Sequence, residues 1–234
     1  MARLEKTQQP EDDQLEDEQP DKRRSPSRWL RYSVIALVML GVFFRFYQLD
    51  EKVYWLDEAR TSLRMSGHTQ TEFIQEVYQG QVIDMATLQR YQSPSADADW
   101  GDTLQALRGN AEHTPLYFLL ARLWTQIFGY SVTSIRSLSA VLSLLVFPCM
   151  FWLTRELFEP QVGRAVAWVG LAIVAVSPLH VLYAQEARPY SLWTVLTLLS
   201  SAVLLWAMRS PHRHRWIAYG ATVALGLYTQ LLFV

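Results

Sequence analysis

Two adjacent carboxylates, Asp57 and Glu58, combine residue types that can move a proton. They lie in residues 54–61, the first polar stretch after a long apolar run. A carboxylate at the edge of a low-dielectric region loses hydration, which raises its pKa and suits it to accept a proton from a hydroxyl. The alternative is structural, because Asp57 would be a favourable cap for a helix that begins at Glu58. Spacing alone leaves both interpretations open.

A second polar cluster contains Gln185, Glu186, Arg188 and Tyr190, with Pro189 between the last two. It forms a very short connector between two apolar runs, so its charges should stay near the level of lipid headgroups. An arginine suits a phosphate there because its forked donors match phosphate oxygens. The alternative is that Glu186 and Arg188 pair with each other and bind nothing.

Two other polar features have simpler explanations. His113 begins an apolar stretch and is a candidate substrate contact, helix cap or metal ligand, but a single histidine offers no ligand spacing. The acidic residues 97–102 lack the spacing of a calcium loop, which favours a solvated turn. Basic residues gather at the ends of apolar runs, and this argues against nucleic acid as a partner.

The elements that must position these residues are long apolar runs. The 234 residues are 50% hydrophobic with a formal net charge of -1, but the charge is unevenly distributed. Several runs have the length of about 20 residues that a bilayer core requires. We therefore expect an all-α fold, a polytopic transmembrane helical bundle; a soluble helical protein seldom needs several such runs ended by Arg or Trp. Cys149 is the only cysteine, so it should be a small buried hydrophobe without a disulfide.

The chain divides into a tail at 1–28 and a membrane module at 29–234. The tail is expected to be disordered because it has hardly any apolar residues. The module should contain about five spans and, after the first, a long loop with amphipathic interfacial helices. The expected spans are about 29–49, 135–154, 164–182, 189–208 and 216–234, and the loop is 50–134. The last run reaches the chain end without a polar flank, so we expect a truncated chain.

The side of the membrane on which each basic connector falls determines how the apolar stretch 115–129 is interpreted. It is short and carries Arg122, which favours a helix at the interface over a span. If it does not span, the basic connectors 155–164 and 209–215 both fall inside, as the positive-inside bias requires. Both polar clusters then lie on the outer face. We expect a multi-pass protein of the inner (plasma) membrane with a cytoplasmic N-terminus and an extracytoplasmic loop 50–134.

Four segments in this order carry a resemblance to a known family. They are Tyr-Trp-Leu-Asp-Glu-Ala at 54–59, His-Thr-Pro-Leu-Tyr-Phe-Leu-Leu at 113–120, Ser-Ile-Arg-Ser-Leu-Ser at 134–139, and Ser-Pro-Leu-His-Val-Leu-Tyr-Ala-Gln-Glu-Ala-Arg-Pro-Tyr at 177–190. Together they resemble the N-terminal portion of the family 39 type membrane glycosyltransferases. These are grouped with the protein O-mannosyltransferases and the aminoarabinose lipid A transferases in the GT-C superfamily.

The resemblance implies an inverting transfer of a sugar from a polyprenyl-phosphate donor to an acceptor hydroxyl on the extracytoplasmic face. The acceptor is a lipid, a glycan or a protein. Asp57 would be the base, Glu58 its partner in positioning the acceptor or a cation, and Glu186 a second acidic site. Arg188 would stabilise the departing phosphate. Further substrate-binding candidates are His113, Arg60, Tyr190 and Gln185.

The resemblance also bears on a metal cofactor and on the second acidic site. A divalent metal ion is an open question, and Glu58 and Glu186 would be its ligands. The protein O-mannosyltransferases carry Asp where this chain has Gln185 and Glu186. The alternatives are a truncated, non-catalytic membrane protein or partner subunit, or a transporter, which would bury ionisable residues inside its spans.

Overall fold

The computed structural model describes residues 28–95, 98–109 and 114–233, so the expected tail at 1–28 lies almost wholly outside them. Within these ranges the regular structure is entirely helical, as expected. The described helices, in chain order, are α1 (Arg28–Phe46), α2 (Leu56–Met65), α3 (Gln70–Val77), α4 (Met85–Arg90), α5 (Trp100–Arg108), α6 (Leu116–Phe128), α7 (Val132–Leu144), α8 (Val146–Leu157), α9 (Pro160–Val176), α10 (Pro178–Ala184), α11 (Tyr190–Met208) and α12 (Arg213–Leu227).

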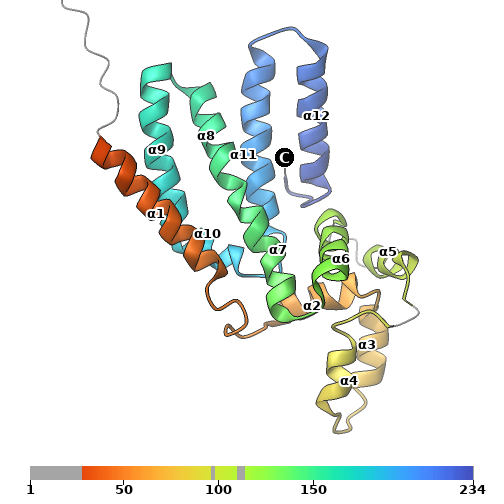
Figure 1. The fold of residues 1–234 in the computed structure, drawn as a ribbon. Helices are drawn as coiled ribbons and strands as arrows, with labels where there is room; N and C mark the ends of the chain where they lie inside the picture. The colour runs from red at the N-terminus through yellow and green to blue at the C-terminus, as the bar shows by residue number, and fades with distance from the viewer. Residues whose placement is uncertain (1–27, 96–97, 110–113, 234) are drawn as a thin grey trace, which may run out of the picture.

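Long apolar helices form one layer of the molecule, in which they lie side by side (Figure 1). Among the described residues, three helical segments are long and apolar enough to cross a bilayer: α1, the consecutive helices α7 and α8, and α11. A fourth candidate is the pair α9 and α10, which is bent by 60°. Large apolar side chains on α1, such as Trp29, Met39 and Phe43, are exposed, as lipid-facing residues would be. The chain is therefore a multi-pass membrane protein.

The fifth expected span, 216–234, has a different form. Its helix, α12, has 15 residues and ends at Leu227, after which the described chain turns back. The ring of Phe233 lies over Gly226, where an added Cβ would be only 2.2 Å from the ring. The described part of the chain thus has three or four candidate spans, and α12 packs against α11 without reaching spanning length.

The bend between α9 and α10 is held by Arg45, near the end of α1. Pro178 begins α10 and has no N–H to donate, which leaves carbonyls of α9 without helical partners. The Arg45 guanidinium donates to the carbonyls of Ala175 at 2.8 Å and Val174 at 3.1 Å. Gly41 allows this close approach, because an added Cβ would lie 2.1 Å from the Ala175 oxygen. The bend directs the chain into the 185–189 connector.

The shorter helices α2 to α6 gather at one end of the long helices (Figure 1). Helix α6 has 13 residues and is below spanning length, as expected. Its Arg122 is buried and donates to the carbonyls of Met65 at 3.3 Å and Ala98 at 2.9 Å, and also bonds Thr103. This arginine therefore ties α2, α5 and α6 together. Cys149 is buried, as expected.

Candidate functional site

Helix α2 begins one residue before Asp57, which determines where both carboxylates point. Trp55 is extended and is the N-cap, so Asp57 is the second helical residue and is not the cap of a helix that begins at Glu58. Glu58 is the third helical residue, and its Oε2 lies 3.5 Å from the Trp55 amide. Acidic residues in a first turn interact favourably with the helix dipole. Neighbouring residues of an α-helix point about 100° apart, so the two carboxylates face different surroundings.

Glu58 faces inward and forms an ion pair with Arg136 of α7. Arg136 Nε donates to Glu58 Oε1 at 2.9 Å and Nη2 donates to Oε2 at 2.7 Å, with both side chains 0% exposed. The amide of Ala187 also donates to Glu58 Oε1, at 2.8 Å. Arg136 further donates to the carbonyls of Lys52 at 2.9 Å and Val53 at 3.0 Å. We call this arrangement the closed pair; it joins α2, α7 and the 185–189 connector.

Asp57 faces outward between two arginines. Its Oδ1 lies 3.7 Å from Arg60 Nη1 and its Oδ2 lies 3.6 Å from Arg188 Nη2. The Asp57 side chain is 28% exposed, whereas that of Arg188 is 9% exposed. We call Asp57 and Arg188 the open pair. A carboxylate in this position can accept a proton from a molecule that arrives from solvent.

Glu186 and Gln185 each have a partner that the sequence did not indicate. Glu186 is paired with Lys52, whose Nζ lies 2.7 Å from Oε1, so the alternative of a Glu186–Arg188 side-chain pair is wrong. Gln185 Nε2 donates to the carbonyls of Phe44 at 2.6 Å and Tyr47 at 3.0 Å. Gln185 therefore anchors the connector to the end of α1.

Arg188 borders a small cavity of about 250 Å³, which is also lined by Thr114, Phe118, Tyr190 and Gln230. The guanidinium lies over the Tyr190 ring at 5.5 Å. Within the described residues, Arg188 Nε and Thr114 Oγ1 are buried without a hydrogen-bond partner. An arginine with a free N–H next to a hydroxyl suits an anionic oxygen. His113 lies outside the described residues, but its neighbour Thr114 reaches this cavity.

A partly buried tyrosine, Tyr54, and a buried one, Tyr117, support the site without being able to act as bases. The Tyr54 hydroxyl donates to the Glu58 carbonyl at 3.1 Å and bonds Ser62. Burial disfavours the phenolate and raises the pKa of Tyr54 to about 12. Burial also raises the pKa of Tyr117, whose hydroxyl bonds Ser139 at 2.7 Å. Asp57 is therefore the better candidate for a proton acceptor.

The described residues offer little support for a metal site at the expected ligands. They contain no group of three or more His, Cys, Asp and Glu side chains that could bind a metal ion. The oxygens of Glu58 accept bonds from Arg136 and Ala187, and Glu186 faces Lys52. Metal ions need several free oxygen or nitrogen ligands.

The acidic residues 97–102 are explained in part by a helix cap. Asp99 Oδ1 accepts from the Asp102 amide at 3.0 Å, and Asp102 Oδ2 accepts from the Asp99 amide at 2.8 Å. These reciprocal bonds form a capping box at the start of α5. Asp97 lies outside the described residues.

Sequence reasoning missed Arg136 and Lys52 as members of the site. Arg136 stands alone in an apolar stretch, and a lone arginine at such a position indicates a buried partner. That signal was available, although it does not identify Glu58. Lys52 lies among other charged loop residues, and nothing in its sequence context indicates that it pairs with Glu186.

Comparison with known proteins adds one finding. Residues 112–234 match the family model described as dolichyl-phosphate-mannose-protein mannosyltransferase, and this range contains Arg136, Glu186 and Arg188. A search of curated proteins gives no match, and a search of solved structures also gives none. The matched residues make up more than half of the chain. The chain therefore belongs to the dolichyl-phosphate-mannose-protein mannosyltransferase family, a family of membrane glycosyltransferases.

Proposed function

We propose that this protein transfers mannose from a polyprenyl-phosphate carrier of the dolichyl type to a hydroxyl of a protein acceptor, with inversion at the anomeric carbon. The observation that carries this proposal is the open pair: a partly exposed carboxylate lies 3.6 Å from an arginine that borders a cavity. Membership of the dolichyl-phosphate-mannose-protein mannosyltransferase family supports the choice of donor and acceptor.

The proposed step is a single displacement. The acceptor oxygen attacks the anomeric carbon while Asp57 takes its proton, and the bond between that carbon and the phosphate oxygen breaks. The electron pair of this bond leaves with the lipid phosphate. Arg188, with Thr114 beside it, stabilises the developing negative charge from the cavity side. Because attack and departure occur on opposite sides of the carbon, the configuration inverts.

The other expected site residues take supporting roles in this proposal. Glu58 is a positioning residue, because its oxygens are committed to Arg136 and Ala187. Glu186 holds Lys52 beside the site, and Arg60 orients Asp57. Tyr190 supports the Arg188 guanidinium through its ring. His113 stays a substrate-binding candidate outside the described residues.

We further propose that α2 to α6 lie on the extracytoplasmic face. The basic connector between α11 and α12 lies at the opposite end of the long helices (Figure 1). Arginines in such a connector favour the cytoplasmic side. Reporter fusions after Gly101 and after Pro211 should therefore give extracytoplasmic and cytoplasmic signals, respectively. A cytoplasmic signal at Gly101 would overturn the orientation.

The experiment for the proposed activity compares Asp57→Asn with Asp50→Asn, a matched change at an exposed loop residue. Membranes that contain the full-length gene product receive polyprenyl-phosphate mannose with a radiolabelled sugar and a threonine-containing peptide. Loss of a general base lowers a rate by about 10²–10⁴-fold, so Asp57→Asn should nearly abolish transfer, whereas Asp50→Asn should keep it. Undiminished transfer by Asp57→Asn would refute the role of Asp57.

A further inference from the structure

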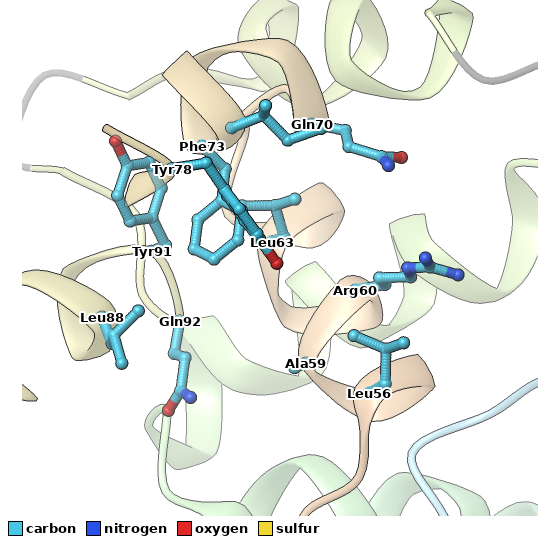
Figure 2. A pocket seen from close by; sticks show the side chains of 11 residues that line it. Leu56, Ala59, Arg60, Leu63, Gln70, Phe73, Tyr78, Leu88, Tyr91 and Gln92 are labelled. Atoms are coloured by element: carbon cyan, nitrogen blue, oxygen red, sulfur yellow. The ribbon is translucent and has the colours of Figure 1, made fainter. Parts of the chain in front are cut away.

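An apolar pocket lies between α2, α3 and α4, beside the open pair. It has a volume of about 430 Å³, within the range of ligand-binding pockets. Figure 2 shows Leu63 of α2, Phe73 of α3 and the ring of Tyr91 converging on it. None of these residues takes part in the proposed transfer step, so the pocket needs an explanation of its own.

The walls of this pocket are held by contacts among the helices around it. The Phe73 and Tyr91 rings meet edge to face with their centres 5.1 Å apart, and the His68 ring lies 5.0 Å from that of Tyr91. The Tyr91 hydroxyl donates to Glu76 of α3, which also pairs with Arg90 of α4. Ring contacts of this kind stabilise a fixed arrangement. The walls of the pocket are therefore held in place by contacts within the fold.

The pocket and the open pair share one wall. Arg60 lines the pocket and also lies 3.7 Å from Asp57. The rise of an α-helix is about 1.5 Å per residue, so these two residues are separated by only about 4.5 Å along α2. An extended polypeptide advances about 3.3 Å per residue. A side chain two to four residues from a hydroxyl at Asp57 can thus enter the pocket.

The position of the pocket distinguishes between the donor and the acceptor as its occupant. Helices α3 and α4 lie at the end of the molecule farthest from α8 and α9 (Figure 1). The isoprenoid chain of a lipid donor stays in the bilayer, among the spanning helices. Gln70, Gln92 and Arg60 add polar groups around the apolar lining, which suit the amides of a peptide backbone.

We propose that this pocket receives an aromatic or large aliphatic side chain of the acceptor polypeptide, close in sequence to the hydroxyl that accepts the sugar. This inference rests on the proposed function and adds a determinant of acceptor choice to it. An apolar side chain leaves water when it enters the pocket, which favours acceptors that carry one. Acceptors with a polar residue at that position gain no binding free energy from the pocket.

The test uses the full-length gene product in nanodiscs and a series of alanine-rich peptides with one threonine. Phe is placed two, three or four residues to either side of the threonine, and Ser replaces it in the reference peptides. At one or more positions, Phe should lower KM by about tenfold relative to Ser, the scale of a small apolar contact, without changing kcat. The absence of any Phe preference in the natural protein would overturn the inference.

Two variants change the volume of the pocket in opposite directions. Phe73→Ala removes part of its lining, and Ala59→Phe fills it from α2. Each should raise KM for the preferred Phe peptide about tenfold and leave KM for the Ser peptide unchanged. Val82→Ala is the matched control, because Val82 is fully exposed and does not line the pocket. Equal effects on Phe and Ser peptides, or a raised KM for polyprenyl-phosphate mannose alone, would overturn the inference.

A binding measurement separates this inference from the proposed activity. Fluorescein-labelled Phe and Ser peptides are titrated with the protein without any donor, and anisotropy is recorded. Selective binding of the Phe peptide that Ala59→Phe abolishes would support the pocket even if no sugar transfer is found. Transfer without selective binding would support the activity and refute the pocket.

Discussion

The closed pair and the open pair are built from neighbouring residues of one helix, yet their surroundings are opposite. Glu58 and Arg136 are 0% exposed and meet through two hydrogen bonds. Asp57 is 28% exposed and lies 3.6 Å from Arg188, beyond hydrogen-bonding distance. The oxygens of Glu58 all accept hydrogen bonds, whereas those of Asp57 make only looser ion pairs with Arg60 and Arg188, and Arg188 borders a cavity.

The first turn of α2 therefore has two roles, one structural and one at the exposed site. The buried carboxylate fixes α2 against α7 and the 185–189 connector through Arg136 and the Ala187 amide. The same connector carries Arg188, so the closed pair sets the distance across the open pair. A structural ion pair of this kind costs desolvation energy, and its contribution is position more than stability.

The largest expected effect follows from breaking the closed pair. Glu58→Gln leaves the charge of Arg136 buried without a counter-charge, which should lower the free energy of unfolding by about 3–5 kcal/mol. Unfolding in mixed micelles, followed by circular dichroism, measures this loss. Glu51→Gln, at an exposed loop position, is the control and should change little. A loss below about 1 kcal/mol in Glu58→Gln would show that the closed pair is not structural.

A second prediction concerns the cation of the open pair. Arg188→Lys keeps the charge but loses the forked donors, so kcat for sugar transfer should fall by about 10²–10³-fold. The thermal midpoint should change by only a few degrees, because Arg188 makes a looser pair than Arg136 does. Arg209→Lys replaces a surface arginine that pairs with Glu156 and should keep the natural rate. An equal loss of rate in both variants would contradict the assignment.

The third prediction concerns the close approach of α1 to α9 at Gly41, beside the helical bend. Gly41→Ala would place a Cβ 2.1 Å from the Ala175 oxygen, which should push α1 from α9 and destabilise the protein by about 1–3 kcal/mol. Gly220→Ala is the matched control, because an added Cβ there meets no atom within 4 Å. Thermal unfolding compares the two. Similar midpoints for both variants would mean that the close approach is not needed.

The smallest expected effect concerns pH and the pocket wall. The hydrogen bond from the Tyr91 hydroxyl to the Glu76 carboxylate lowers the pKa of Glu76 in the folded protein, and the hydrogen bond and positive charge of Arg90 lower it further. The ionised Glu76 carboxylate therefore stabilises the folded protein above the ordinary glutamate pKa of about 4.3. This contribution is lost as the pH falls through the lowered pKa of Glu76 in the folded protein. Tyr91→Phe should have a lower thermal midpoint than the natural protein at pH 7, and the difference between the two midpoints should shrink below about pH 4. A difference that is constant with pH would contradict the prediction.

The sequence predicted much of the fold because apolar runs of spanning length are a strong signal. The spans that include α1, α7 with α8, and α11 were expected, as was the short helix α6. The run 216–234 was expected to span, whereas the described helix α12 ends at Leu227. Hydropathy does not register a reversal such as the contact of Phe233 with Gly226. A count of apolar residues cannot show where a helix ends.

Some members of the candidate site were predictable, but Arg136, Lys52 and the surroundings of each carboxylate were not. Asp57 and Glu58 could be named from residue type and position, and so could Arg188. Which carboxylate is buried depends on the exact helix start at Leu56, and sequence boundaries are uncertain by a few residues. The pairs of Glu58 with Arg136 and of Glu186 with Lys52 join residues more than 75 positions apart. No local pattern in one sequence encodes such contacts.

The roles of the two carboxylates can be separated by measuring Asp57→Asn and Glu58→Gln side by side, each for initial rate of mannose transfer and for thermal midpoint. Asp57→Asn should lose about 10²–10⁴-fold in rate and keep its midpoint within a few degrees. Glu58→Gln should lower the midpoint markedly, and the protein that stays folded at low temperature should retain measurable transfer. The reverse pattern, with a stable but inactive Glu58→Gln and an active Asp57→Asn, would contradict the assignment of the two carboxylates.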